Sequence, residues 1–426
     1  MNKTTFVAIR TTAVLGLIIG AVQIGAGPSP AWAQQPPPPA VVPPPPGAAP
    51  PPPAAEAAPA AEAPASTALT TPSMTGPLVA NPNPLVAIDQ EPFGKIYTGG
   101  AVTGLGLFQT DPVKGDRSVH GDASNAQVFF QKTDGMFQFL AQIGAYSFPS
   151  LGAAYINAGR SVGDLYGPAP VAYGKFAPND SFSIQGGKLP TLIGYEYGFT
   201  FQNMNIERGL LWNQEPVVSH GVQGNYTWGP LAFSLSLNDG FYSGRYSWLS
   251  GSATWTIDKI NTVSVTAGGN FSPSAKSSLA TPFPQNDSTI VDLIYTYNSA
   301  PWTITPYFQF TNVPASAKLG IGHDASTYGG AILASYQFTD NLSLAGRAEY
   351  ITSTGSAANG APSLLYGPGS SAFSFTVTPT YQWGIYFFRD ELSYVQANSI
   401  TPGAAFGRGG GNRDQARILV EAGVIF

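Results

Sequence analysis

The sequence predicts an all-β fold, a transmembrane antiparallel β-barrel of about 16 strands, preceded by a signal peptide and a Pro/Ala-rich disordered tether. Asp, Glu, Lys and Arg make up only 10% of the 426 residues, whereas soluble domains average about 25%. Many short segments alternate apolar with small polar residues, and tight turns alternate with long loops between them. These three observations favour strands with one face toward lipid and the other toward a polar lumen.

Residues 1–33 have the pattern of a secretory signal peptide. Lys3 and Arg10 carry positive charge, residues 13–22 form an apolar core, and Ala31-Trp32-Ala33 is a small-x-small cleavage site. No later segment has the roughly 18 consecutive apolar residues that a membrane-spanning helix needs. We therefore expect an exported protein that has no helical anchor.

Residues 34–94 are predicted to be a Pro/Ala-rich linker. Residues 35–64 are almost entirely Pro and Ala, with the two glutamates Glu56 and Glu62. Such a composition cannot bury a core and favours an extended polyproline II spacer. The following residues, 66–92, are expected to be irregular. We expect this tether to lie in the periplasm.

The barrel is predicted to occupy residues 95–426. Its segments recur about every 21 residues, a spacing that suits strands of about ten residues with their connections. The sixteen predicted strands are 95–108, 123–132, 136–147, 169–177, 181–188, 218–228, 231–238, 247–257, 261–271, 288–298, 302–312, 326–338, 341–351, 372–383, 386–396 and 414–426.

The alternation is clearest in residues 231–238, where leucine and phenylalanine alternate with alanine, serine and asparagine. A β-sandwich would also alternate, with the apolar faces turned inward. The connections distinguish the two folds, because tight turns such as Asp134-Gly135, Gly229-Pro230 and Asp258-Lys259 alternate regularly with long loops. Short periplasmic turns and long outer loops are typical of bacterial outer-membrane barrels. The pattern predicts the Gram-negative outer membrane, with both ends of the barrel in the periplasm.

Three residues fit the predicted strands poorly. Pro306 and Pro379 lie inside strands, where each removes one donor from the hydrogen-bonded ladder. Alternation turns Asp390 outward while Arg389 and Glu391 turn inward. Either a β-bulge resets that strand, or Asp390 lies near the lipid headgroups.

Composition argues against several function classes. The chain has no cysteine, which excludes disulfides and cysteine-based metal sites. Its net charge is −5 and it has no basic patch, so nucleic-acid binding has no support. The three histidines, His120, His220 and His323, form no recognisable zinc motif or catalytic triad. We therefore predict no enzyme, no catalytic or metal residue and no cofactor.

The segment from Gly187 to Gly240 resembles the OmpL-like group of outer-membrane β-barrel porins. The matching motifs are Gly187-Lys188-Leu189-Pro190-Thr191, Gly194-Tyr195-Glu196, Asn205-Ile206-Glu207-Arg208, Pro216, His220-Gly221-Val222 and Asn238-Asp239-Gly240. Membership implies a passive diffusion channel for small hydrophilic solutes. The terminal Phe426, with apolar residues at alternate positions before it, also resembles the signal that the barrel-assembly machinery reads in bacterial outer-membrane proteins.

Residues 189–217, after the fifth predicted strand, resemble in position the constriction loop that general porins fold into the lumen. The charged candidates in this loop are Glu196, Glu207, Arg208 and Glu215. Charged groups that are fixed in a narrow aqueous pore bias which solutes enter it. The alternative is a loop that projects outward or packs on a neighbouring subunit.

Six further charged residues are predicted to point into the lumen. By alternation they form the same-strand pairs Arg347 with Glu349, Arg389 with Glu391, and Arg417 with Glu421. They either neutralise one another as wall ion pairs or act on solutes. If the arginines face the acidic loop across the pore, a transverse field results.

The function predicted from these features is passive diffusion of ions and small hydrophilic solutes across the outer membrane. The rival is a non-conducting structural protein or adhesin that acts through its outer loops, with an outer-membrane hydrolase as a weaker alternative. A substrate-specific channel is a further option, which saturable flux would reveal. Analogy with sixteen-stranded porins favours a homotrimer in contact with outer-membrane lipids.

Overall fold

The computed structural model describes residues 73–81, 85–91 and 94–426. The predicted signal peptide and the Pro/Ala-rich stretch at 35–64 lie outside the described residues. In the described part of the chain, no helix is long and apolar enough to cross a membrane.

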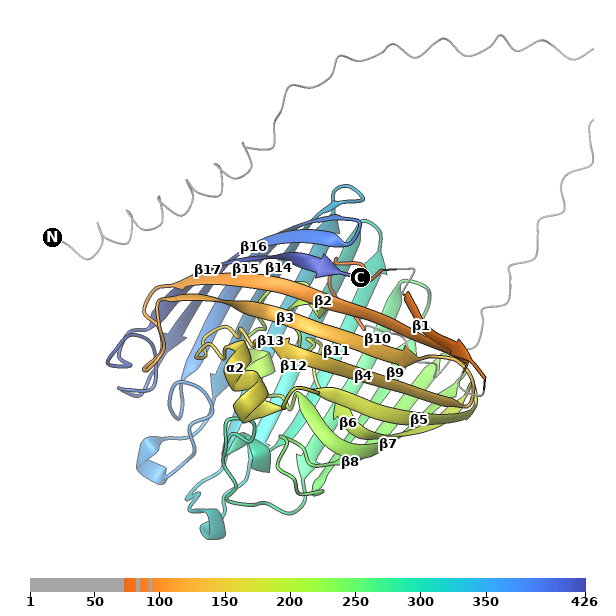
Figure 1. Cartoon of the computed structure of the whole chain (residues 1–426). Coiled ribbons are helices and arrows are strands. Elements are labelled where there is room, and N and C mark those ends of the chain that lie inside the picture. The colour runs from red at the N-terminus through yellow and green to blue at the C-terminus, as the bar shows by residue number, and fades with distance from the viewer. Residues whose placement is uncertain (1–72, 82–84, 92–93) are drawn as a thin grey trace, which may run out of the picture. The chain divides into compact units, whose positions relative to one another are not determined.

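Sixteen antiparallel strands, β2 to β17, close into a barrel (Figure 1). The ring closes where β17 pairs with β2, from Arg417 opposite Gln109 to Ile425 opposite Ala101. The barrel strands are β2 (Gly94–Gln109), β3 (Val119–Lys132), β4 (Phe137–Tyr146), β5 (Val171–Asn179), β6 (Phe182–Pro190), β7 (Val218–Trp228), β8 (Leu231–Asn238), β9 (Trp248–Thr256), β10 (Asn261–Asn270), β11 (Thr289–Ser299), β12 (Trp302–Val313), β13 (Ala325–Gln337), β14 (Leu342–Ser353), β15 (Ser371–Trp383), β16 (Tyr386–Asn398) and β17 (Asp414–Ile425). The predicted fold is confirmed, and strand ends differ from the predictions by at most four residues, at the start of β3.

Side chains alternate between the two faces of the barrel as the sequence predicts. On β8, Leu235 is 59% exposed on the outer face, whereas Ser236 is 3% exposed on the inner face. The same alternation on β15 turns Phe373 and Phe375 outward and buries Ser374. Since a slip of one residue would turn every apolar side chain into the lumen, this alternation specifies the register of the strands.

One additional strand corrects the expectation of an irregular segment at 66–92. β1 (Leu85–Gln90) pairs antiparallel with the first residues of β2, from Leu85 opposite Thr98 to Gln90 opposite Gly94. It lies on the same edge of β2 as β17, beyond the point where β17 ends. Pairing is available there because β2 is longer than β17 and would otherwise leave an unpaired edge.

Pro306 and Pro379 both lie on the outer face of the barrel. The pairing of β11 with β12 is interrupted at Pro306, and that of β15 with β16 at Pro379, but each pair of strands keeps the same register on both sides of the interruption. Asp390 also points outward, opposite Val420, and the register of β16 with β17 is unbroken around it. The structure therefore excludes the alternative of a β-bulge at Asp390. This carboxylate lies on the outer surface of the barrel, beside the position of Pro379.

Short helices occur only in the long loops of the described chain. They are α2 (Ala158–Arg160), the π-helical turn η1 (Ser161–Leu165), and the 3-10 turns η2 (Thr200–Gln202), η3 (Leu211–Gln214), η4 (Gln285–Asp287), η5 (Ala317–Leu319) and η6 (Ala357–Asn359). At the opposite rim, tight turns join the strands. There the backbone of Phe426 exchanges hydrogen bonds of 2.8 and 3.0 Å with Gly100, so the last residue extends the pairing of β17 with β2.

Candidate functional site

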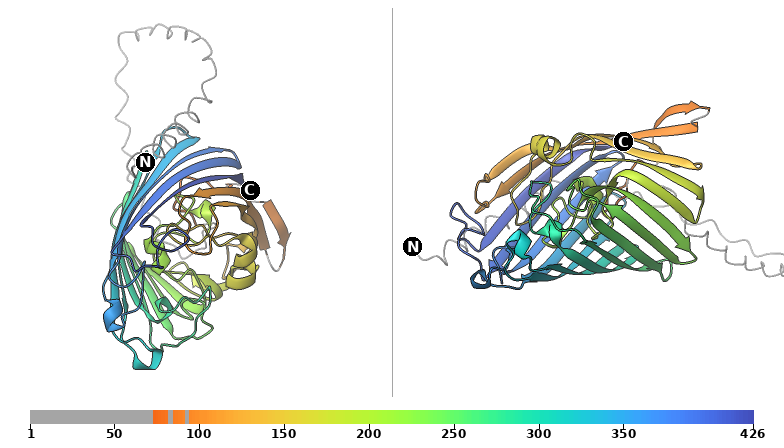
Figure 2. Two further views of the ribbon diagram at one scale, coloured as in Figure 1. Left: turned by 90° about the vertical axis from the view of Figure 1, so that its left-hand side faces the viewer. Right: turned by 90° about the horizontal axis from the view of Figure 1, so that it is seen from below.

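The loop at 191–217, between β6 and β7, lies inside the barrel. Its backbone and side chains contact inward-facing residues of β11, β12, β14, β16 and β17. Figure 2 shows this yellow-green segment within the ring of strands. The outward alternative for this loop is therefore wrong in the structure, although its role as a constriction remains a proposal.

Two wall glutamates accept hydrogen bonds from the backbone of the loop. Leu210 and Leu211 donate their N–H groups to the Glu349 carboxylate at 2.9 and 3.3 Å. Ile206 and Glu207 donate theirs to Glu391 at 2.5 and 3.0 Å. A buried backbone N–H without a partner costs about 1–3 kcal/mol. These carboxylates accept the N–H groups of the loop, as the carbonyls of a neighbouring strand would in a sheet.

Arg347 joins the loop to the wall. Its guanidinium lies 2.6 Å from Glu196 and 3.2 Å from Glu349, and it donates to the Glu207 carbonyl at 2.8 Å. Of the three predicted same-strand pairs, Arg347 with Glu349 is the one that the structure contains.

Arg389 and Arg417 form ion pairs with glutamates outside their own strands. Arg389 pairs with Glu421 across the β16–β17 ladder, where these residues are directly opposite. Arg417 pairs with Glu207 of the loop at 2.8 Å. Arg389 and Glu391, like Arg417 and Glu421, share the inward face as alternation predicts, but they form no ion pair in the described chain. Glu391 accepts backbone N–H groups of the loop instead, and Glu421 is directly opposite Arg389.

These arginines also donate hydrogen bonds to backbone carbonyls of the loops, which lie outside the strand pairing. Arg389 donates to the carbonyls of Thr200 at 2.9 Å and Asn203 at 3.1 Å. Arg417 donates to Ser150 at 2.6 Å and Ala153 at 2.5 Å, in the neighbouring loop. The guanidinium groups thus contact the loops directly, whereas the predicted transverse field requires them to face the acidic loop across open water.

We call the inward side chains of β14, β16 and β17 the charged wall. Its members are Arg347, Glu349, Arg389, Glu391, Arg417 and Glu421, and each is at most 3% exposed. Buried charges are costly unless they are paired and hydrogen-bonded. The charged wall meets that demand by binding the loop, so its first effect is to hold 191–217 inside the lumen.

Arg208 is the exception among the lumen arginines. Its side chain is fully buried, and none of its three guanidinium nitrogens has a hydrogen-bond partner. The guanidinium lies over the rings of Phe148 and Trp212, 5.3 and 5.1 Å from their centroids. Burial lowers the pKa of Arg208 to about 10, against the opposing charges of Glu196 and Glu207. Aromatic faces thus supply the stabilisation that carboxylates supply to the other three arginines.

Glu215, at the end of the loop, binds the wall through neutral groups. One carboxylate oxygen accepts hydrogen bonds from the Tyr307 hydroxyl and from the Gln309 amide, the latter at 2.9 Å. Burial raises the pKa of Glu215 well above its ordinary value, and the nearby charge of Asp292 adds to the rise. Burial also raises the pKa of Glu196, although Arg347 opposes the change.

Several residues of this site were missed at the level of sequence. Asp292, Tyr307 and Gln309 lie at inward positions of β11 and β12, and the charge of Asp292 at such a position is the signal that could have found it. No pattern indicated that residues 73–79 contact the loop. Thr75 and Gly76 donate to the Gln202 carbonyl at 2.8 and 3.2 Å, and Leu78 is buried.

The opposite side of the barrel is uncharged. We call the inward side chains of β7 to β10 the polar wall, and these four strands contain no Asp, Glu, Lys or Arg. Its polar members include Ser219, Gln223, Asn225, Thr227, Ser234, Ser236, Asn238, Ser250, Ser252, Thr254, Thr262, Ser264, Thr266 and Asn270, and Trp248 also faces inward. Small neutral hydroxyls and amides can face water without needing a partner chain.

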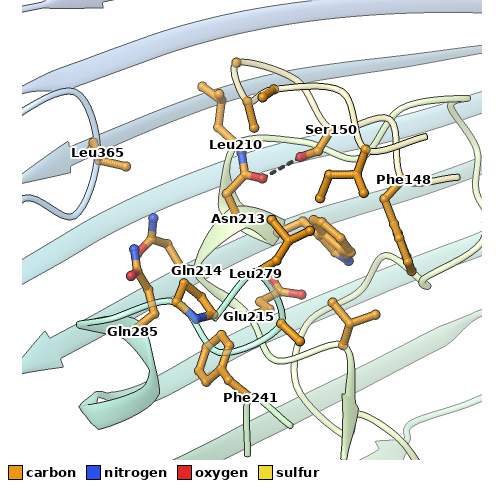
Figure 3. Close-up of a pocket in the computed structure, with 18 of the residues that line it drawn as sticks. Phe148, Ser150, Leu210, Asn213, Gln214, Glu215, Phe241, Leu279, Gln285 and Leu365 are labelled. Atoms are coloured by element: carbon orange, nitrogen blue, oxygen red, sulfur yellow. Dashed lines mark hydrogen bonds between the residues drawn. The ribbon is translucent and has the colours of Figure 1, made fainter. Parts of the chain in front are cut away.

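A cavity of about 340 Å³ lies where the loops meet inside the barrel. Figure 3 shows Phe148, Leu210 and Phe241 around it, with Glu215 at its edge. Ser150 and Asn213 are hydrogen-bonded to each other beside it at 2.5 Å. Glu215 is the one acidic residue among the described residues that line this cavity.

The family described as "Putative beta-barrel porin-2, OmpL-like" matches residues 95–426, which confirms the resemblance in the segment from Gly187 to Gly240. Among curated proteins, none matches the chain significantly. The outer membrane channel DcaP of Acinetobacter baumannii has a similar structure, with a TM-score of 0.55 and 11% identity over 80% of this chain and 100% of that chain. The outer-membrane expressed OmpT of Vibrio cholerae has a TM-score of 0.51 and 10% identity, with coverage of 80% and 100%. At these identities the likeness concerns the fold alone.

Proposed function

The chain belongs to this OmpL-like β-barrel porin family of the Gram-negative outer membrane, and we propose that it lets small hydrophilic solutes and cations diffuse passively across that membrane. The proposed conduit runs between the lumen loop 191–217 and the polar wall. The proposed constriction is formed by Glu196, Glu207, Arg208 and Glu215. In this arrangement the tether at 34–94 lies in the periplasm.

The observation that carries this proposal is the attachment of the loop inside the lumen, where most of its hydrogen bonds and ion pairs go to the charged wall. Three arginines and three glutamates of the charged wall bind the loop or its neighbour at 148–166. The polar wall has no charged group for such an attachment. A loop that is bound inside a lumen narrows it, and the small neutral side chains of the polar wall suit a water-filled path beside the loop.

The charges of the site support a preference for cations. The loop and the charged wall contain six glutamates against four arginines, and Asp292 adds a further carboxylate. Fixed negative charge in a water-filled pore raises the local concentration of cations and excludes anions. We therefore expect cations to permeate better than anions.

Single-channel recording in planar bilayers tests this function. Refolded protein should give stable current steps that rise nearly linearly with KCl concentration, and a salt gradient should give a reversal potential of the sign for cations. Swelling of liposomes in small neutral sugars would extend the test to uncharged solutes. A folded, heat-modifiable barrel that gives no steps would overturn the proposal.

One observation favours a second candidate, a non-conducting outer-membrane protein that acts through its outer loops. Apolar side chains of several loops pack together inside the barrel, among them Leu151, Leu210, Leu211 and Tyr366. If this packing seals the lumen, the outer loops are the remaining functional surface. The same recordings separate the two candidates, because only the porin conducts.

Assembly is proposed by analogy with porins. We expect a homotrimer within the outer-membrane lipids, inserted by the barrel-assembly machinery through the signal at Phe426. Chemical crosslinking of intact outer membranes would show a trimer, and deletion of Phe426 should lower the amount of folded barrel. An unchanged amount of heat-modifiable protein after that deletion would remove Phe426 from this role.

A further inference from the structure

Two neighbouring lumen carboxylates, Glu215 and Asp292, have neither an arginine partner nor a full set of hydrogen-bond donors. Glu196, Glu207, Glu349 and Glu421 each form an ion pair with an arginine. Glu391 accepts two backbone N–H groups and the Thr378 hydroxyl. Among the described residues, neither Glu215 nor Asp292 forms an ion pair with Arg or Lys.

The two carboxylates belong to one cluster, which spans β11, β12 and the loop. Asp292 accepts hydrogen bonds from the Thr266 hydroxyl at 2.9 Å and from the Gly194 N–H at 3.0 Å. The Gln309 amide donates to Glu215 at 2.9 Å and to the Tyr307 hydroxyl at 2.8 Å, and Gln309 is directly opposite Asp292 in the β11–β12 ladder. Gln309 is therefore placed between the carboxylates.

Three oxygens of this cluster have no hydrogen-bond partner. They are Glu215 Oε2, Asp292 Oδ1 and Gln309 Oε1. Their side chains are 4%, 0% and 1% exposed. A buried acceptor without a donor is costly, and two buried carboxylates that share a site repel each other. All three belong to one hydrogen-bonded cluster, and carboxylate and amide oxygens are the ligands that a hard cation takes.

Gly194 makes the cluster possible. Its backbone φ is +85°, and a Cβ atom at this position would lie 1.8 Å from Glu215 Oε2. Any side chain would therefore displace the Glu215 carboxylate from its place beside Asp292. The glycine lets the end of the loop approach the wall while its own N–H binds Asp292.

We propose that Glu215, Asp292 and Gln309 bind one divalent cation, of the class of Ca²⁺ or Mg²⁺, between the lumen loop and the barrel wall. Oxygen-only ligands of mixed carboxylate and amide type are those that Ca²⁺ accepts, with water completing its six to eight positions. Within the described chain no third acidic side chain, histidine or cysteine joins the two carboxylates. Water would therefore complete the coordination of the ion, and Glu215 is the ligand that also lines the cavity between the loops.

The site would give the cation a structural role in the pore. It would join Glu215, at the end of the loop, to β11 and β12, which the charged wall does not reach. It would also remove part of the negative excess beside the conduit, so this role rests on the proposed porin function, whereas binding itself does not.

Calcium binding to the purified, refolded full-length barrel tests the site. After removal of divalent ions by EGTA, titration with CaCl₂ in a calorimeter should show about one tight site per chain, and TbCl₃ should give luminescence sensitised by Tyr307. Asp292→Asn and Gln309→Ala should each weaken binding at least about tenfold. Asp340→Asn, in an exposed tight turn, is the matched control and should bind as the wild type does.

Each outcome decides the proposal. Loss of the site in Gln309→Ala with retention in Asp340→Asn would support it, even if Asp292→Asn failed to fold. Absence of Ca²⁺, Mg²⁺ and Tb³⁺ binding to wild-type protein would overturn it, as would unchanged binding to both site variants. Conductance of the same preparation separates the two proposals, because a barrel that conducts but binds no cation leaves the porin function intact, and one that binds without conducting leaves only the cation site.

Discussion

The charged wall and the polar wall have the same alternation of side chains, but they interact differently with the loops inside the barrel. Both place their side chains in the lumen at every second residue. The charged wall is almost fully buried, because loops cover it and its charges are paired with them. The polar wall has no Asp, Glu, Lys or Arg to pair, and the loop meets these strands through an apolar contact of Ile193 with Trp248. The comparison indicates that in this barrel, lumen charge attaches loops, and that an absence of charge leaves room beside them.

Arg389→Ala should have the largest effect on this contrast. The change removes the partner of buried Glu421 and the donors to the Thr200 and Asn203 carbonyls. Breaking a buried ion pair from one side costs about 3–5 kcal/mol. Urea unfolding of the refolded barrel should show that loss, whereas Ser234→Ala on the polar wall should cost less than about 1 kcal/mol. Equal effects of the two changes would contradict the distinction between the walls.

Gly194→Ala should have the next largest effect, because it strikes the loop where it meets the wall. The left-handed backbone and the contact with Glu215 both oppose a Cβ atom, and such strain costs about 1–3 kcal/mol. Gly224→Ala, on β7 of the opposite side, is the control, since a Cβ there meets nothing within 4 Å. The unfolding midpoints of both variants provide the comparison. A Gly194→Ala barrel as stable as Gly224→Ala would mean that the loop end is not held in this position.

Neutralising the acids of the loop tests the electrostatic half of the comparison. With Glu196, Glu207 and Glu215 all replaced by Gln, the permeability ratio of cations to anions should fall roughly severalfold, because fixed negative charge leaves the lumen. The reversal potential in a KCl gradient measures this ratio. The control is Asp340→Asn, outside the lumen. An unchanged reversal potential would place the conducting path away from this loop.

The smallest expected effect locates the path itself. Because the chain has no cysteine, a single introduced thiol can be labelled cleanly. Ser252→Cys on the polar wall should react with a cationic methanethiosulfonate and lower the conductance roughly twofold, since the label narrows the proposed conduit. Ser374→Cys, fully buried beneath the loop and bound to Glu349, should react slowly and leave the current unchanged. The opposite order of reactivity would move the path to the charged wall.

Much of this protein was open to prediction from its sequence, because the relevant signals are local. The alternation of apolar and polar residues predicted the strands and the inward direction of Arg347, Arg389 and Arg417. The turn residues predicted where the strands are connected. The loop at 189–217 was identified by its length and charge. Its matching motifs in the segment from Gly187 to Gly240 indicated the family before any fold was known.

What only the tertiary structure decided depends on position around the ring. Alternation says that Arg389 points inward, but it cannot say that Glu421, rather than Glu391, lies within reach. It cannot bring Asp292 of β11 to Glu215 of the loop, or residues 73–79 to Gln202, because those contacts join segments far apart in sequence. The face toward which a side chain points is a property of one strand, which the sequence alone determines. Partnership is a property of the closed barrel, and distances across its lumen exist only once all sixteen strands have closed.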